Sequence, residues 1–191
     1  MANQKARPLA SLKRRARGDD TSESIGALAE ELKTASDRAV AVVVASILDR
    51  SLEDALLGWM RTLSAGDREA LFSTRGVLAS FSAKIDLAFA FKIYGPNTRA
   101  DLHTIREIRN LFAHARLTLS FSDEAIARAI YSLHLRKKAS EGGFVYQATS
   151  GSDPPYCLTR RCYRTNRDVL ARVSWVIWVV LRRAGRQRSR S

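Results

Sequence analysis

The feature that most constrains the fold is a long amphipathic stretch from Ser36 to about Leu63. Its apolar side chains recur every three or four residues, which places them on one face of an α-helix, and charged side chains fall between them. Ser36 is a favourable helix cap, and Asp37 adds a negative charge to the first turn. A helix of this length with one apolar face predicts that other helices pack against it. The apolar positions are Val40, Val43, Val44, Ile47, Leu48, Leu52, Leu56 and Trp59.

Six further stretches carry helical signals, bounded by capping side chains, a proline or helix-breaking glycines. They cover about residues 22–32, 67–72, 80–94, 98–115, 122–138 and 163–183. We therefore predict an all-α protein, a single bundle of about six to seven helices. The exception is a Gly- and Pro-rich insertion at about residues 139–160, where FVYQA, SGSDPP and YCLT suit a small β-hairpin near residues 144–159.

The positive charge of the chain is concentrated at its two ends. The 191 residues include 32 Lys and Arg against 19 Asp and Glu, a net charge of +13, and the segments 1–17 and 181–191 are basic without a single acidic residue. We expect residues 1–20 and 184–191 to be disordered basic arms on a helical domain of residues 21–183. Such arms attract nucleic acid weakly and without reading sequence, by releasing counterions from phosphates; solubilising tails with no partner are the equal alternative. The candidate contacts are Lys13, Arg14, Arg15, Arg17, Arg182, Arg183, Arg186, Arg188 and Arg190.

The sequence carries no signal for export, membrane insertion or a cofactor. Cys157 and Cys162 lack the second pair that a structural zinc site needs, and they make no disulfide framework. The longest apolar runs, 39–48 and 173–181, are far shorter than the roughly 20 residues that span a bilayer, and no apolar stretch precedes Ile25. No Gly-rich phosphate loop is present. We therefore expect a cytoplasmic protein with reduced thiols, no membrane span and no cofactor.

Polar side chains gather on one stripe of the predicted helix 98–115. They are spaced by four, three and four residues, so at about 100° per residue they point to the same side, opposite the apolar face. Two arginines flank the stripe, whereas ordinary helix surfaces more often place lysine and glutamate there. The stripe consists of His103, Glu107, Asn110 and His114, flanked by Arg106 and Arg109.

The element Arg109-Asn110-Leu-Phe-Ala-His114 resembles the Arg-polar-x-x-x-His signature of HEPN-type ribonucleases. In that superfamily two copies of the signature, usually from a helical dimer, face each other across a cleft and cut RNA without a metal. The resemblance implies that Arg109 binds the scissile phosphate, that His114 moves protons and that Asn110 orients either of them. It therefore implies a metal-independent endoribonuclease. The signature itself spans only six residues, 109–114.

The alternative interpretation of the same residues is structural. Arg109, Asn110 and His114 would then form a buried hydrogen-bond network with acids on neighbouring helices, such as Asp37, Asp49 or Asp86, since a buried guanidinium needs such partners. Simple salt-bridged helix contacts account for Asp37 with Arg38 and for Lys84 with Asp86. A metal site at His103, Glu107 and His114 is disfavoured because no independent ligand cluster supports it. The predicted polar network comprises Asp37, Arg38, Asp49, Ser82, Lys84, Asp86, His103, Arg106 and Glu107.

Three longer stretches together resemble the mannitol operon repressor (MltR-like) family: SDRAVAVVVASILDRSLEDAL (36–56), GVLASFSAKIDLAFAFKIY (76–94) and LHTIREIRNLFAHARLTLSFSD (102–123). The resemblance covers about residues 21–138. It implies an all-helical domain and a role in transcriptional repression. Members of the family lack a recognised helix-turn-helix, and none is evident here, so the expected route to repression is a protein partner. A non-catalytic protein-interaction module without a role in transcription is the further alternative. The basic arms and the insertion at 139–160 depart from the family's compact form, so the regulated operon does not carry over.

We also expect self-association, most simply a homodimer. The resemblance to HEPN-type domains implies pairing of two copies. In addition, Trp175, Trp178 and five aliphatic side chains between Val173 and Val180 nearly encircle the last predicted helix, more than one bundle face covers. The alternative is that this helix is the central core helix of a monomer.

Overall fold

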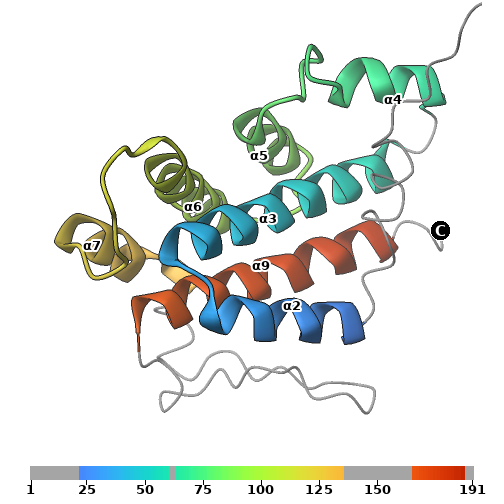
Figure 1. Ribbon diagram of the computed structural model, residues 1–191. Helices are drawn as coiled ribbons and strands as arrows, with labels where there is room; N and C mark the ends of the chain where they lie inside the picture. Colours follow the sequence, from blue (N-terminus) through green and yellow to red (C-terminus); the bar gives the residue numbers. More distant parts are fainter. Residues whose placement is uncertain (1–21, 61–62, 136–164, 188–191) are drawn as a thin grey trace, which may run out of the picture.

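The computed structural model describes residues 22–60, 63–135 and 165–187 of the chain. This part of the chain contains seven helices and no strand, so the prediction of an all-α bundle of six to seven helices is confirmed (Figure 1). None of these helices is long and apolar enough to span a membrane. The helices are α2 (Ser22–Thr34), α3 (Asp37–Trp59), α4 (Ala65–Phe72), α5 (Phe81–Ala90), α6 (Pro96–His114), α7 (Glu124–Ser132) and α9 (Asn166–Gln187).

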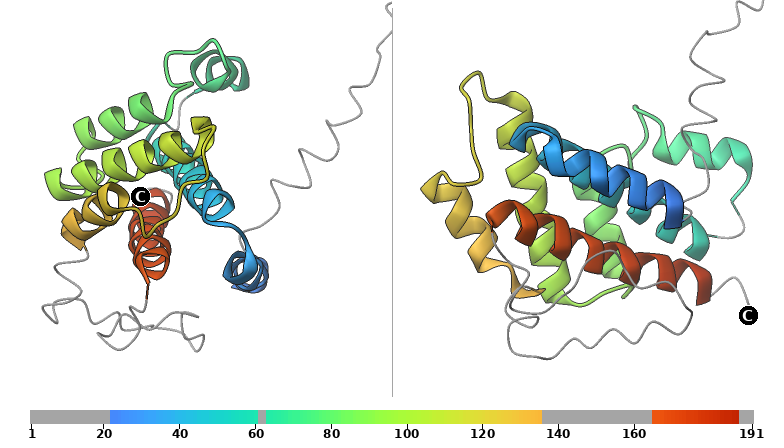
Figure 2. Two further views of the ribbon diagram at one scale, coloured as in Figure 1. Left: turned by 60° about the vertical axis from the view of Figure 1, so that its left-hand side comes forward. Right: turned by 60° about the horizontal axis from the view of Figure 1, so that its bottom comes forward.

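Helix α3 is the centre of the bundle, as its length and periodicity predict. It packs against α9 along one side and against α5 and α6 along another, while α7 contacts α6 and α9. Figure 2 shows α9 running alongside α3, with α2 and α4 at the periphery. The buried face of α3 includes Leu48, Leu52 and Leu56, each 0% exposed, and it meets Phe112 of α6 and Ile177 of α9 in one continuous core. Burial of these large apolar side chains is the main stabilising term of the fold.

Side-chain caps begin the helices where the sequence predicts them. Ser36 Oγ accepts from Ala39 N at 3.2 Å at the start of α3, and Ser80 Oγ accepts from Ala83 N at 3.1 Å at the start of α5. The cap of α4 differs from the prediction: Ser64, not Asp67, is the N-cap, and Asp67 is its reciprocal partner in a capping box. The start of α4 therefore lies two residues earlier than predicted.

Three helices end before their predicted boundaries: α3 ends at Trp59 rather than about Leu63, α7 at Ser132 rather than about residue 138, and α5 at Ala90. The predicted helix 80–94 ends four residues early because Lys92 takes a left-handed conformation with φ 57°. Ile93 N then donates to Ala88 O at 3.0 Å and Lys92 N to Phe89 O at 2.8 Å. These two bonds form a Schellman motif, in which a glycine usually occupies the left-handed position. Gly95 instead precedes Pro96, the first residue of α6.

The turn before α5 requires its glycine. A Cβ atom at Gly76 would lie 2.2 Å from Leu71 O, closer than any non-bonded contact allows. The same turn is closed by Leu78 N, which donates to Leu71 O at 2.9 Å. This close backbone approach fixes the direction in which the chain enters α5, and with it the position of Ser80.

Several predictions fall outside the described residues. These are the β-hairpin near 144–159, both cysteines, the arm 1–20 and the last residues of the tail. The final helix continues to Gln187, four residues past its predicted end at Arg183, so residues 184–187 are helical and not disordered. Alanine, arginine and glutamine in this segment have high helix propensity, which outweighs the single Gly185.

Candidate functional site

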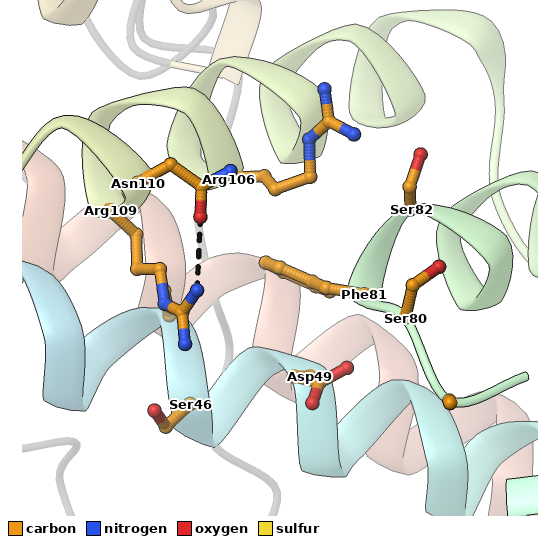
Figure 3. A pocket seen from close by; sticks show the side chains of 10 residues that line it. Ser46, Asp49, Ser80, Phe81, Ser82, Arg106, Arg109 and Asn110 are labelled. Carbon is orange, nitrogen blue, oxygen red and sulfur yellow. Dashed lines mark hydrogen bonds between the residues drawn. The ribbon is translucent and has the colours of Figure 1, made fainter. Parts of the chain in front are cut away.

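A pocket of about 330 Å³ opens where α3, α5 and α6 meet, and we call it the α3–α5–α6 pocket. Helix α3 contributes its small and acidic side chains, the start of α5 contributes hydroxyl groups and an aromatic ring, and α6 contributes two guanidinium groups (Figure 3). The lining residues are Ala45, Ser46, Asp49, Ala79, Ser80, Phe81, Ser82, Arg106, Arg109 and Asn110.

Arg109 and Asn110 bond to each other in this pocket. Arg109 Nη1 donates to Asn110 Oδ1 at 2.9 Å (Figure 3). A guanidinium has only donors, so this bond orients the amide with its oxygen towards Arg109 and leaves the Asn110 NH₂ group available as a donor. Among the described residues, no carboxylate forms an ion pair with Arg109.

Asp49, the acid in the same pocket, is held by a lysine. Lys84 Nζ lies 3.1 Å from Asp49 Oδ1 and 3.1 Å from Glu53 Oε2, and the Lys84 side chain is only 5% exposed. Lys84 belongs to α5 and both acids to α3, so this ion pair joins the two helices next to the pocket. It corrects the sequence-based pairing of Lys84 with Asp86, which are two residues apart and face different sides of α5.

Arg106 lies one turn before Asn110 on α6. Its nearest acid is Glu107, with Nη2 to Oε1 at 3.7 Å, and the Glu107 side chain is 69% exposed. The Arg106 Nε atom is buried and has no hydrogen-bond partner among the described residues. Figure 3 shows that Arg106 extends towards the start of α5, where Ser82 lies, and that Arg109 extends towards α3. The two guanidinium groups therefore occupy different sides of the pocket, with the Phe81 ring between them.

His114, the third residue of the ribonuclease-like signature, does not line the pocket. It is the last residue of α6 and is exposed to solvent. Five residues of helix turn the chain by about 140° beyond a full turn, so Arg109 and His114 point to different sides of α6. Arg109 and Asn110 are thus brought together in the pocket, and His114 points to a different side of α6 from Arg109 within one chain.

The other two predicted acidic partners of Arg109 also bind elsewhere. Asp86 Oδ1 accepts from Arg99 Nη2 at 2.6 Å and lies 3.2 Å from His103 Nε2. The hydrogen bond from Arg99 lowers the pKa of Asp86, with a smaller contribution from His103, while partial burial opposes both. This cluster joins α5 to the first half of α6, and it accounts for His103 as a structural side chain.

Asp37 and Arg38 hold the segment that follows α6. Asp37 Oδ2 accepts from Phe121 N at 3.0 Å and from Ser120 Oγ at 3.1 Å. Arg38 Nη2 donates to the carbonyl oxygens of residues 115 and 117, at 2.8 and 3.2 Å. The first turn of α3 therefore fixes the backbone beside His114, which places these two residues in the polar network but away from Arg109.

Sequence reasoning missed one buried carboxylate. Asp101 is 1% exposed and accepts from the backbone N of His134 at 2.8 Å and of Leu135 at 2.9 Å, with the His134 ring at 3.0 Å. It ties α6 to the end of α7. An acidic residue between apolar positions of a helix is the only signal that the sequence gives for it.

The described part of the chain contains no group of three or more potential metal ligands. Of the basic candidates in the arms, Arg182 has a described side chain: its guanidinium lies 4.9 Å from the ring centre of Trp178 on α9. Arg183 and Arg186 belong to α9, but their side chains are outside the described set, and Lys13, Arg14, Arg15, Arg17, Arg188 and Arg190 are outside it altogether. The predicted nucleic-acid contacts thus remain predictions.

No protein-family model matches this chain, and a search of curated proteins finds no significant match. The resemblances to the mannitol operon repressor family and to HEPN-type ribonucleases rest on the quoted motifs and remain predictions.

Proposed function

We propose that this protein is a non-catalytic, repressor-type regulator of transcription that resembles the MltR-like family and acts by binding a protein partner. The observation that carries the proposal is the separation of Arg109 from His114. Arg109 is turned into the α3–α5–α6 pocket and bonded to Asn110, whereas His114 is exposed at the end of α6. A general acid–base residue must reach the proton that it transfers, so a ribonuclease site at Arg109 and His114 would need a second copy of the chain to complete it, whereas binding needs only one. The basic arms add weak, sequence-independent contacts to nucleic acid.

The end of α6 offers a surface for such a partner. Leu111, on the last turn of α6, is 54% exposed, and Leu117, three residues past its end, is 76% exposed. The bonds from Asp37 and Arg38 hold this segment in place, so its shape is set before a partner binds. We assign the partner contact to this segment because it presents two exposed leucines close together in the sequence, on a backbone that Asp37 and Arg38 hold.

Transcript measurements in the native cell separate regulation from RNA cleavage. The gene is deleted and restored as wild type, His114→Ala, Leu117→Ser or Val77→Ser. Val77 is the control, because it is 75% exposed but lies before α5. For each strain, transcript abundance is measured, and so is transcript half-life after transcription initiation is blocked.

We expect wild type, His114→Ala and Val77→Ser to restore the repressed transcripts through a lower synthesis rate, with half-lives unchanged. Leu117→Ser should restore them poorly. Restoration that requires His114 and acts through shorter half-lives would instead establish the ribonuclease. Full activity of Leu117→Ser would exclude this end of α6 as the partner surface.

A further inference from the structure

We propose that the α3–α5–α6 pocket binds a small organic phosphate monoester. The first support is charge. Arg109 forms no ion pair with a described carboxylate, and Arg106 has only the distant and exposed Glu107. Asp49 also lines the pocket, but it shares Lys84 with Glu53, so these three side chains carry one net negative charge. The two guanidinium groups outweigh that charge, and the excess positive charge is left for a ligand to balance.

The second support is an excess of hydrogen-bond donors. Ser80 Oγ already accepts from Ala83 N, so its hydroxyl hydrogen is free to donate into the pocket. Ser82 makes no side-chain hydrogen bond to a described residue, and the Asn110 NH₂ group is a free donor because its oxygen faces Arg109. The side of the pocket on α3 differs, since the Ser46 hydroxyl donates to Val42 O at 2.7 Å and Asp49 contributes carboxylate acceptors. A ligand rich in acceptor oxygens matches this set.

The start of α5 adds to the same preference. Phe81 and Ser82 are its first two residues and both line the pocket. Backbone N–H groups in the first turn of a helix have no carbonyl acceptor within the helix, and the helix dipole places partial positive charge there. Arg106 extends towards this turn (Figure 3), so the phosphate is expected between Arg106 and the start of α5.

Size and shape indicate a small ester rather than a bare ion. The volume of about 330 Å³ is at the lower end of the range of about 300–1,000 Å³ for ligand pockets and exceeds what one phosphate fills. The Phe81 ring between the two arginines gives an apolar wall for an organic group (Figure 3). A phosphate monoester carries about 1.5 to 2 negative charges at neutral pH, which suits two guanidinium groups better than one carboxylate does. Phosphate binding here does not depend on whether the protein regulates transcription.

Isothermal titration calorimetry on the full chain at physiological ionic strength tests the proposal. The probes are phenyl phosphate, inorganic phosphate, benzoate and a single-stranded RNA of mixed sequence. The variants are Arg106→Gln, Arg109→Gln and the control Arg116→Gln, which alters an exposed arginine outside the pocket. Phenyl phosphate should bind one to one and more tightly than inorganic phosphate or benzoate. Loss of one charged hydrogen bond should weaken binding by about tenfold in Arg106→Gln. Arg109→Gln removes a positive charge from the other side of the pocket but no contact to the phosphate, so its effect should be smaller, and Arg116→Gln should change the affinity by less than about twofold.

A second readout uses the wild-type chain, so that it does not depend on the folding of a variant. Phenyl phosphate should shift the backbone amide NMR signals of Phe81 and Ser82, and these shifts should depend on its concentration in the same way as the heat of binding measured by calorimetry. The proposal is overturned if no saturable heat is seen, if the shifts occur only outside the pocket, or if Arg116→Gln weakens binding as much as Arg106→Gln. Tighter binding of RNA than of phenyl phosphate, lost in Arg106→Gln, would reassign the pocket to a nucleic-acid backbone.

Discussion

Replacing Lys84 by methionine should destabilise the protein strongly, because it leaves Asp49 and Glu53 without their shared cation. The Lys84 side chain is 5% exposed, while the two carboxylates are 34% and 31% exposed. Breaking a fully buried ion pair costs about 3–5 kcal/mol, and the partial access of water to both acids reduces the expected loss to about 2–3 kcal/mol. Methionine keeps most of the apolar stem of lysine, so the loss in the free energy of unfolding reports the removal of the positive charge.

Urea unfolding followed by circular dichroism measures this loss. With a slope of about 1–3 kcal/mol per molar urea, the midpoint should fall by about 1–2 M. The triple variant Lys84→Met, Asp49→Asn, Glu53→Gln should recover to within about 1 kcal/mol of wild type, since no charge is left unpaired. Lys33→Met is the matched control: its pair with Glu30 is exposed, and its loss should be below about 1 kcal/mol. A Lys84→Met loss below about 1 kcal/mol, or a triple variant as unstable as the single one, would refute the charge argument.

Three further substitutions test other parts of the structure by the same unfolding assay. Asp86→Asn should cost less than about 1 kcal/mol at neutral pH, since the site is half-exposed. Because the Arg99 hydrogen bond lowers the pKa of Asp86, this difference is present above the ordinary carboxyl pKa and should vanish as the pH falls through the lowered value; a difference that grows on acidification would contradict it. Asp101→Asn should cost about 2 kcal/mol because an NH₂ group then faces buried backbone N–H groups, and an unchanged midpoint would show that they find other acceptors. Lys92→Gly should stabilise by about 0.5–1 kcal/mol and Lys92→Val should destabilise, since residue 92 is left-handed; equal stabilities would contradict the strain.

The fold was largely predictable because its main signals are local. The spacing of Val40, Val44, Leu48 and Leu52 predicts the buried face of α3, and each of these side chains is buried. Ser36 and Ser80 cap the helices as predicted. The end of α5 was not predictable in the same way, because Lys92 occupies a left-handed position that glycine normally fills.

The site was less predictable because it depends on which helices are neighbours. The sequence identified Arg109, Asn110 and Asp49 as polar residues. It does not show that Lys84 forms the ion pair with Asp49, so that Arg109 has no ion pair with a described carboxylate. The separation of Arg109 from His114 follows from helical geometry alone, since five residues do not return to the same face. The pocket itself appears only when α5 is placed across α3 and α6.

A cleavage assay with purified protein tests most directly whether this protein acts by binding rather than by chemistry. Mixed RNAs are incubated in EDTA with the wild type, Arg109→Ala and His114→Ala, and the variants are checked for folding by circular dichroism. The structure places Arg109 in the pocket and His114 at the surface, away from it, so none of the three proteins should cut RNA. Metal-independent cleavage by the wild type that is lost in both folded variants would contradict the proposed function and establish Arg109 and His114 as one catalytic centre.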